Sequence, residues 1–170
     1  MDAFQLDTVM VSSSPVGFWH PTDGQAGYYP YVAENSTATL MTDPTGSWAV
    51  QPDEVAMEGS AAGQYSIVQF VVPSSGTYDL EADFAGIHIR LSTTDVHVMV
   101  NDLSLFDAEI DGYGGDPSFH AVEGQSPQAT CRATEILRAG DVLSFAVGIG
   151  SNGTNANDTT GLFVHITSSQ

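Results

Sequence analysis

The chain has 170 residues, 42% of them hydrophobic, which is enough for one domain with a buried core and excludes general disorder. It has 21 acidic residues but only three arginines and no lysine, so the formal net charge is −18. A surface this acidic repels nucleic-acid phosphates and anionic lipid headgroups, which excludes nucleic-acid binding. The charge favours neutral partners, cationic partners or divalent cations, or it serves only solubility in a salty or calcium-rich medium.

The N-terminal third of the chain predicts short strands joined by long loops. From Ser12 to Gly63 the sequence is rich in Gly, Pro, Ser and Asp, and it holds both tryptophans. So short and polar a segment could hardly build a core of its own. We therefore assign it to the same domain as the rest of the chain.

Period-two alternation of apolar and polar residues predicts β-strands through the remainder. In Tyr78–Phe84 the apolar side chains face one way and the acidic ones the other, and in Thr94–Val100 three valines form the inner face. Further strands are expected at Tyr65–Val72, Leu103–Phe106 and Val142–Val147, separated by Gly, Pro and Asn-Asp turns. No helical periodicity of useful length and no apolar run of membrane-spanning length is present. The sequence predicts an all-β protein, an antiparallel β-sandwich or jelly roll formed by residues 1–170 as a single domain.

Aromatic residues in polar, loop-like surroundings predict a binding surface for sugars. The apolar face of a pyranose stacks on an aromatic ring, and neighbouring amide, carboxylate and backbone groups fix the hydroxyls. The alternative is that the tryptophans are core anchors. Because neighbouring side chains in a strand point to opposite faces, at least one ring of the tyrosine run should be exposed. The candidate carbohydrate-binding residues are Trp19, Tyr28, Tyr29, Tyr31, Trp48 and Tyr113.

Two acidic stretches are candidates for a structural Ca²⁺ site. Asp107–Gly112 matches the first six positions of a calcium loop, but position twelve is Ser118, and an alternative is a strand with an acidic outer face. Within the polar loop Gly148–Thr160, the segment Asn152–Thr160 is expected to fold on itself around Asp158, through hydrogen bonds or around the ion, the alternative being a flexible loop without a role. The expected metal ligands are Asp107, Asp111 and Asp158, the alternative being that these carboxylates are only a solvated surface.

Catalytic motifs are missing from the sequence. The five histidines are scattered, with His97 and His165 at outward strand positions where solvation is the ordinary state. There is no nucleophile elbow, zinc-ligand spacing or Gly-rich phosphate loop, although a glycosidase-type carboxylate pair stays open in so acidic a chain. Cys131, the single cysteine, is expected to be a buried apolar filler. We expect no enzyme.

Several longer stretches follow one another in the order of a known module. They are "SPVGFW" (Ser14–Trp19), "VVPSSGTYDLEADFAG" (Val71–Gly86), "TTDVHVMVND" (Thr93–Asp102), "LF…GYGG" and "LRAGDVLSFAVGIGSNGTNANDTTGL" (Leu137–Leu162). Together they resemble a jelly-roll domain of exported bacterial proteins, including PEP-CTERM-type surface proteins and multidomain polysaccharide-degrading enzymes. The resemblance implies a non-catalytic carbohydrate-binding module or an ancillary β-sandwich.

The leading hypothesis is a secreted or cell-surface, non-catalytic module that binds a polysaccharide through aromatic loop residues. The opening "MDAF" looks like an initiator Met added to an excised segment, so we expect catalytic or surface domains beside it in a larger secreted protein. The alternatives are a structural or interaction module without a sugar site, and a small jelly-roll enzyme.

Overall fold

A computed structural model describes residues 8–13, 16–21, 30–43, 45–113 and 123–169. These residues form fourteen β-strands and no helix, which confirms the all-β prediction. Within those ranges, no helix is therefore long and apolar enough to cross a membrane.

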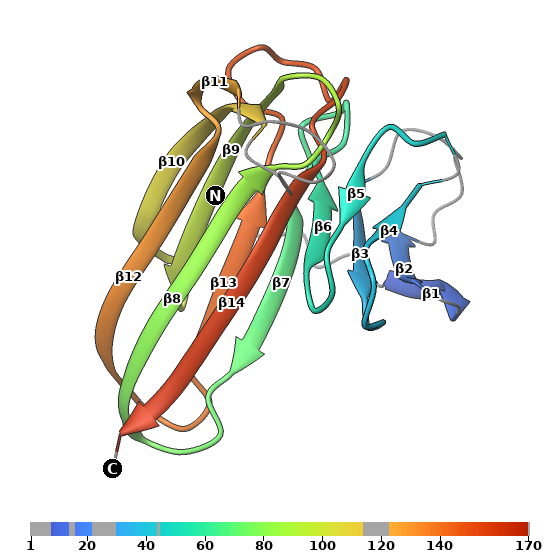
Figure 1. The fold of residues 1–170 in the computed structure, drawn as a ribbon. Coiled ribbons are helices and arrows are strands. Elements are labelled where there is room, and N and C mark those ends of the chain that lie inside the picture. The colour runs from blue at the N-terminus through green and yellow to red at the C-terminus, as the bar shows by residue number, and fades with distance from the viewer. Residues whose placement is uncertain (1–7, 14–15, 22–29, 44, 114–122, 170) are drawn as a thin grey trace.

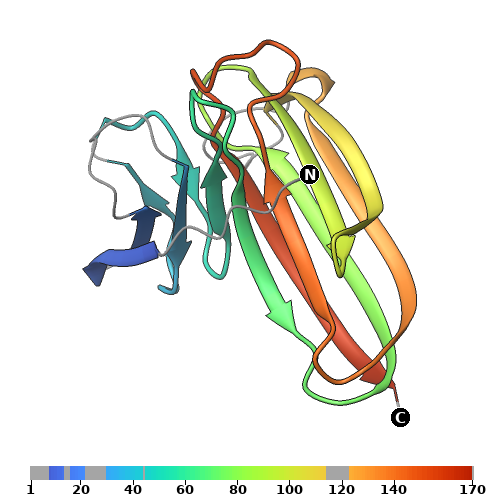
Figure 2. The ribbon, with the colours of Figure 1, turned by 180° about the vertical axis from the view of Figure 1, so that it is seen from behind.

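Two antiparallel sheets contain most of the strands (Figures 1 and 2). The seven-stranded sheet has the order β1 (Thr8–Ser13), β2 (Val16–Pro21), β3 (Tyr31–Asn35), β6 (Val55–Glu58), β14 (Thr160–Ser169), β8 (Gly76–Gly86) and β12 (Gln128–Leu137). The five-stranded sheet has the order β11 (Glu123–Ser126), β10 (Leu103–Tyr113), β9 (Ser92–Val100), β13 (Val142–Val147) and β7 (Ser66–Val71). A small two-stranded sheet joins β4 (Met41–Thr42) to β5 (Ala49–Val50).

The main core lies between the two large sheets and follows the predicted alternation. On β8 the side chains of Tyr78 and Leu80 are buried, whereas the intervening Asp79 is exposed. On β9, Val96 and Val98 are fully buried and pack in the same cluster. Cys131 from β12, the predicted apolar filler, is also buried. Two apolar faces therefore meet in one sandwich core, and the polar faces point outward.

A smaller core cluster closes the end of the sandwich nearest β3 and β5. It consists of Ala33, Val50, Ala56 and Ile87, with Tyr31, Met41 and Trp48 packed against it. Because β3 pairs with β6 and β6 with β14, the N-terminal strands extend the seven-stranded sheet.

The polar loop between β13 and β14 lies along the start of β9. The backbone N–H of Gly148 donates to the Asp95 carbonyl at 2.8 Å, and the N–H of Gly150 donates to Asp95 Oδ1 at 2.7 Å. Asp158 Oδ1 accepts from the N–H of Thr93 at 2.9 Å. The loop does bond within itself, through Thr154 N–H to Asn152 Oδ1 and through Asp158 N–H to the Asn155 carbonyl at 3.4 Å. The expectation needs correcting at the Asp158 side chain, which bonds to β9 and not to its own loop.

Candidate functional site

Two of the six predicted aromatic residues, Tyr31 and Trp48, lie together. Their rings are stacked with centroids 6.2 Å apart and an interplanar angle of 29°, and both are half-buried against the smaller core cluster. Trp19 pairs with Val32 through its backbone in β2, and Tyr113 ends β10, but their side chains are not described. Tyr28 and Tyr29 lie outside the described residues. Of the six candidates, only Tyr31 and Trp48 therefore have side chains that the structure describes.

The Tyr31 hydroxyl belongs to a polar network beneath this stack. It donates to Glu58 Oε2 at 3.2 Å and lies 3.0 Å from Thr159 Oγ1, while the Thr159 hydroxyl donates to the same Glu58 oxygen at 3.0 Å. Burial raises the pKa of the Glu58 carboxyl, and the two hydroxyl donors oppose part of that rise. Burial and the nearby Glu58 charge raise the pKa of Tyr31 well above its usual value. The Tyr31 phenol therefore stays protonated, and its hydrogen bond with Thr159 links β3 to the β13–β14 loop.

The three predicted metal ligands occupy separate places. Asp107 and Asp111 lie on the exposed outer face of β10, so the Asp107–Gly112 stretch is a strand with an acidic outer face. Asp158 is fully buried in the loop just before β14. Among the described residues, no three His, Cys, Asp or Glu side chains are grouped as a metal site.

Asp158 is chemically unusual among the buried residues. Its Oδ2 atom is buried and has no hydrogen-bond partner, the single such side-chain atom in the part of the chain that the structure describes. Burial raises the pKa of Asp158 to about 7, which the Thr93 N–H opposes and the negative charge of Glu58 reinforces. The sequence identified this residue, but not that one of its oxygens would be left unpaired.

His97 was expected to be solvated, but it lies between two carboxylates on the outer face of the five-stranded sheet. Its Nε2 is 2.8 Å from Asp95 Oδ2, and its Nδ1 is 2.5 Å from Asp107 Oδ1. Tyr65 donates to Asp95 Oδ2 at 2.5 Å and meets the imidazole edge-on. The hydrogen bond to Asp95, supported by Asp107, raises the pKa of His97 although burial opposes this. The sequence signal was available, because Asp95 and His97 are two apart in one strand and share a face.

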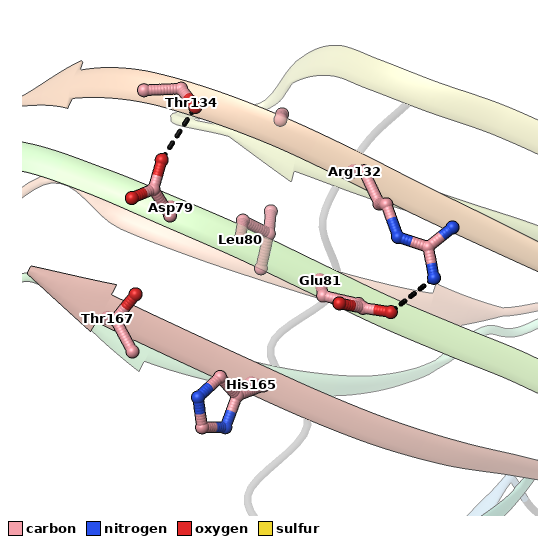
Figure 3. A pocket seen from close by; sticks show the side chains of 8 residues that line it. Asp79, Leu80, Glu81, Arg132, Thr134, His165 and Thr167 are labelled. Atoms are coloured by element: carbon pink, nitrogen blue, oxygen red, sulfur yellow. Dashed lines mark hydrogen bonds and ion pairs between the residues drawn. The ribbon is translucent and has the colours of Figure 1, made fainter.

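A shallow trough of about 430 Å³ lies on the outer face of β12, β8 and β14 (Figure 3). Two cross-strand rows form it: the first joins Arg132, Glu81 and His165, and the second joins Thr134, Asp79 and Thr167. Successive outward residues on one strand are about 6.7 Å apart, and neighbouring strands are about 4.8 Å apart. The rows therefore make a polar patch two strand spacings wide.

The trough combines hydrogen-bond donors and acceptors. Arg132 donates to Glu81 Oε1, and the Thr134 hydroxyl donates to Asp79 Oδ1 at 2.6 Å. His165 is exposed and stands beside Glu81 in the neighbouring strand (Figure 3). Guanidinium and imidazole N–H groups donate, carboxylates accept, and hydroxyls do both. This is the inventory needed to bind a ligand rich in hydroxyl groups.

The sequence matches no protein-family model and no curated protein sequence. Several solved structures resemble the fold at low identity. A structure described as "CBM4 structure and function" is 12% identical, with 87% of this chain and 93% of that chain covered and a TM-score of 0.39. A family 35 carbohydrate-binding module from Clostridium thermocellum is 13% identical, with 92% and 98% covered and a TM-score of 0.31.

Rabbit GITRL is also similar, at 8% identity, with 79% of this chain and 80% of that chain covered and a TM-score of 0.34. At these values the likenesses identify no ligand for this chain. The assignment to the antiparallel β-sandwich rests on its own strands and sheets.

Proposed function

We propose that this domain is a non-catalytic carbohydrate-binding module that holds a neutral polysaccharide against its polar trough. The observation that carries the proposal is the trough itself, where two rows of donors and acceptors line one open hollow of about 430 Å³. Each sugar ring offers several hydroxyls that both donate and accept, so it can pair with carboxylate, guanidinium and threonine groups together. The resemblance of the sequence to modules of exported bacterial proteins supports the same function.

The net charge of −18 favours neutral over acidic glycans as the ligand. Carboxylated or sulfated polysaccharides would meet Asp79 and Glu81 in the trough and an acidic surface around it. Neutral chains avoid that repulsion. The proposed partner is therefore an uncharged polysaccharide, met outside the cell by a protein that also carries catalytic or surface domains.

The half-buried rings of Tyr31 and Trp48 are proposed as a second contact, at the end of the same sheet. Trp48 is the better candidate, because the Tyr31 hydroxyl is held by Glu58 and Thr159. A loop tryptophan with part of its ring exposed can stack a sugar, in line with the aromatic loop residues predicted from the sequence. Its contribution is expected to be on the order of 2 kcal/mol, by analogy with aromatic anchors at other interfaces.

Affinity electrophoresis across soluble neutral and acidic polysaccharides tests the proposal, together with pull-down on insoluble ones. A neutral polymer should retard the protein, and the double variant Asp79→Asn/Thr134→Val should weaken its affinity about 30-fold, because two lost hydrogen bonds cost about 2 kcal/mol together. Glu109→Gln, which removes an exposed carboxylate from the other sheet, is the matched control.

If none of the neutral polysaccharides retards the protein, the proposed function is rejected. Binding that the trough variant leaves intact and Trp48→Ala abolishes would move the site to the aromatic pair. Release of soluble products from the panel would make the domain an enzyme instead.

A further inference from the structure

Asn152 and Gly153 lie at an exposed turn of the β13–β14 loop. The Asn152 side chain is exposed, and a Cβ built on Gly153 would meet no atom within 4 Å. The loop is hydrogen-bonded to β9 on both sides of this turn, through the Gly150 N–H and through Asp158 Oδ1. The turn can therefore change its covalent structure while the rest of the loop stays attached to the sandwich.

The side-chain amide of Asn152 is arranged for attack at its carbonyl carbon. Its Oδ1 accepts a hydrogen bond from the Thr154 N–H at 2.9 Å. That donor polarises the carbonyl and stabilises the negative charge that Oδ1 acquires when a nucleophile adds to Cγ. Among the described residues, neither Asn152 Nδ2 nor the Gly153 N–H makes a hydrogen bond. The leaving nitrogen and the neighbouring backbone nitrogen are therefore both free to react.

Gly153 exposes this backbone nitrogen better than any other residue could. It has no Cβ, and its φ of +70° lies in the left-handed region that glycine adopts without strain. A side chain at this position would crowd the nitrogen and restrict the rotation that brings it to Asn152 Cγ. Asn152 is the one asparagine, among five in the chain, that a glycine follows.

Three of the other asparagines have their amide nitrogen held by acceptors. Asn35 is fully buried and donates its Nδ2 to two backbone carbonyls. Asn101 donates its Nδ2 to Asp141 Oδ1 at 2.9 Å, and Asn155 donates to Glu58 Oε1 at 3.4 Å. The combination of exposure, a free amide nitrogen and a following glycine therefore belongs to Asn152.

We infer that Asn152 is a site of spontaneous deamidation in which Gly153 supplies the nucleophile. The Gly153 nitrogen bonds to Asn152 Cγ and closes a five-membered succinimide ring, while the bond from Cγ to Nδ2 breaks. The Gly153 amide proton leaves with Nδ2 as ammonia, and nothing is oxidised or reduced. Water then opens the ring at either carbonyl, which gives aspartate or isoaspartate.

The reaction changes the loop and not the core. It adds one negative charge at the exposed turn, and isoaspartate also lengthens the backbone between Asn152 and Thr154. No enzyme or cofactor takes part, so the fraction converted increases with the age of the molecule. This inference is independent of the proposed sugar binding.

The test follows the folded, unmodified protein in mildly alkaline buffer by tandem mass spectrometry of its proteolytic fragments. Asn152 should change from amide to acid before any of the other four asparagines, which serve as internal controls. Part of the product should be isoaspartate, which an isoaspartyl methyltransferase labels and which ring opening explains. Earlier conversion of another asparagine, or aspartate without isoaspartate, overturns the inference.

Two variants and an unfolded sample show what the turn contributes. Gly153→Ala should slow the conversion severalfold, because its Cβ shields the attacking nitrogen. Gly46→Ala is the matched control and should leave the rate unchanged, since Gly46 also has a positive φ and open space around its Cβ position. The protein unfolded in urea gives the reference rate. If Asn152 stays intact in the folded protein while the unfolded chain converts, the folded loop protects it and the inference is overturned.

Discussion

At the scale of single residues, His97 on the outer face of the five-stranded sheet is held between two carboxylates. Both ring nitrogens point at carboxylates, Asp95 on its own strand and Asp107 on β10, so the doubly protonated ring suits the site best. Hydrogen bonds from His97, Tyr65 and the Gly150 N–H hold the pKa of Asp95 well below its usual range, although burial alone would raise it. Burial, with the hydrogen bond to Asp95, raises the pKa of Tyr65 to about 12.

Replacing His97 by glutamine should change how stability depends on pH. Because the folded-state pKa of His97 is raised, its contribution is complete below the unfolded pKa of about 6.5 and is lost as pH rises through the higher folded value. The variant should be less stable by about 2 kcal/mol near pH 6, from the loss of charged hydrogen bonds. The difference should shrink above the folded pKa, as urea unfolding at a series of pH values will show.

His165→Gln is the control for this experiment, because His165 is exposed on β14. It should change the free energy of unfolding near pH 6 by less than about 0.5 kcal/mol, as exposed substitutions usually do. A profile that is the same in the parent protein and in His97→Gln would mean that the imidazole is neutral between its two carboxylates.

At the scale of the elements, Gly148 sets how closely the β13–β14 loop approaches β9. A Cβ at this position would lie 2.3 Å from Asp95 Oδ1 and 2.6 Å from Tyr65 Cε1. Gly148→Ala should therefore displace the loop and cost about 1–3 kcal/mol of unfolding free energy, the usual cost of overpacking. Chemical denaturation of the parent protein and the variant measures this difference in unfolding free energy.

Gly76→Ala is the matched control. At the start of β8 its added Cβ would meet nothing closer than 3.7 Å, so stability should change by less than about 0.5 kcal/mol. Equal costs at Gly76 and Gly148 would show that the close approach to Asp95 is not what makes the glycine necessary.

Local sequence pattern predicted the strands and their inner faces, but not their partners. The alternation in Tyr78–Phe84 identified the core side of β8, because period two is a property of neighbouring residues. That β14 lies between β6 and β8 depends on contacts far apart in sequence. For the same reason the sequence singled out Asp158 without its bond to Thr93, and it placed His97 in solvent without the cross-strand Asp107.

The polar trough was the feature hardest to predict from the sequence. Arg132, Glu81 and His165 come from three strands and meet only through the register of the sheet. The aromatic residues attracted attention because ring stacking is a known mode of sugar binding, whereas polar residues on outer strand faces usually serve solubility alone. A cross-strand row is recognisable only once the pairing is known.

At the scale of the whole molecule, the charge of −18 opposes compaction. Adding sodium chloride should therefore raise the melting temperature, since a gain of about 1 kcal/mol corresponds to about 2–4 °C for a chain of this size. A neutral solute at equal osmolality is the control and should give a smaller rise. A melting temperature indifferent to salt would mean that the acidic side chains are spaced too widely to repel one another.

The long register between β14 and β8 has a mechanical consequence. Every residue from Thr160 to Ser169 has a partner in β8, and the strand ends at the C-terminal tip of the sandwich (Figure 1). A pull on that tip along the strand axis loads all of these backbone hydrogen bonds in shear, so none can open one at a time as in a zipper. Resistance to such a load is governed by the rate of unfolding and not by the equilibrium free energy. Tension applied through the C-terminal strand is therefore resisted by the whole β14–β8 ladder at once.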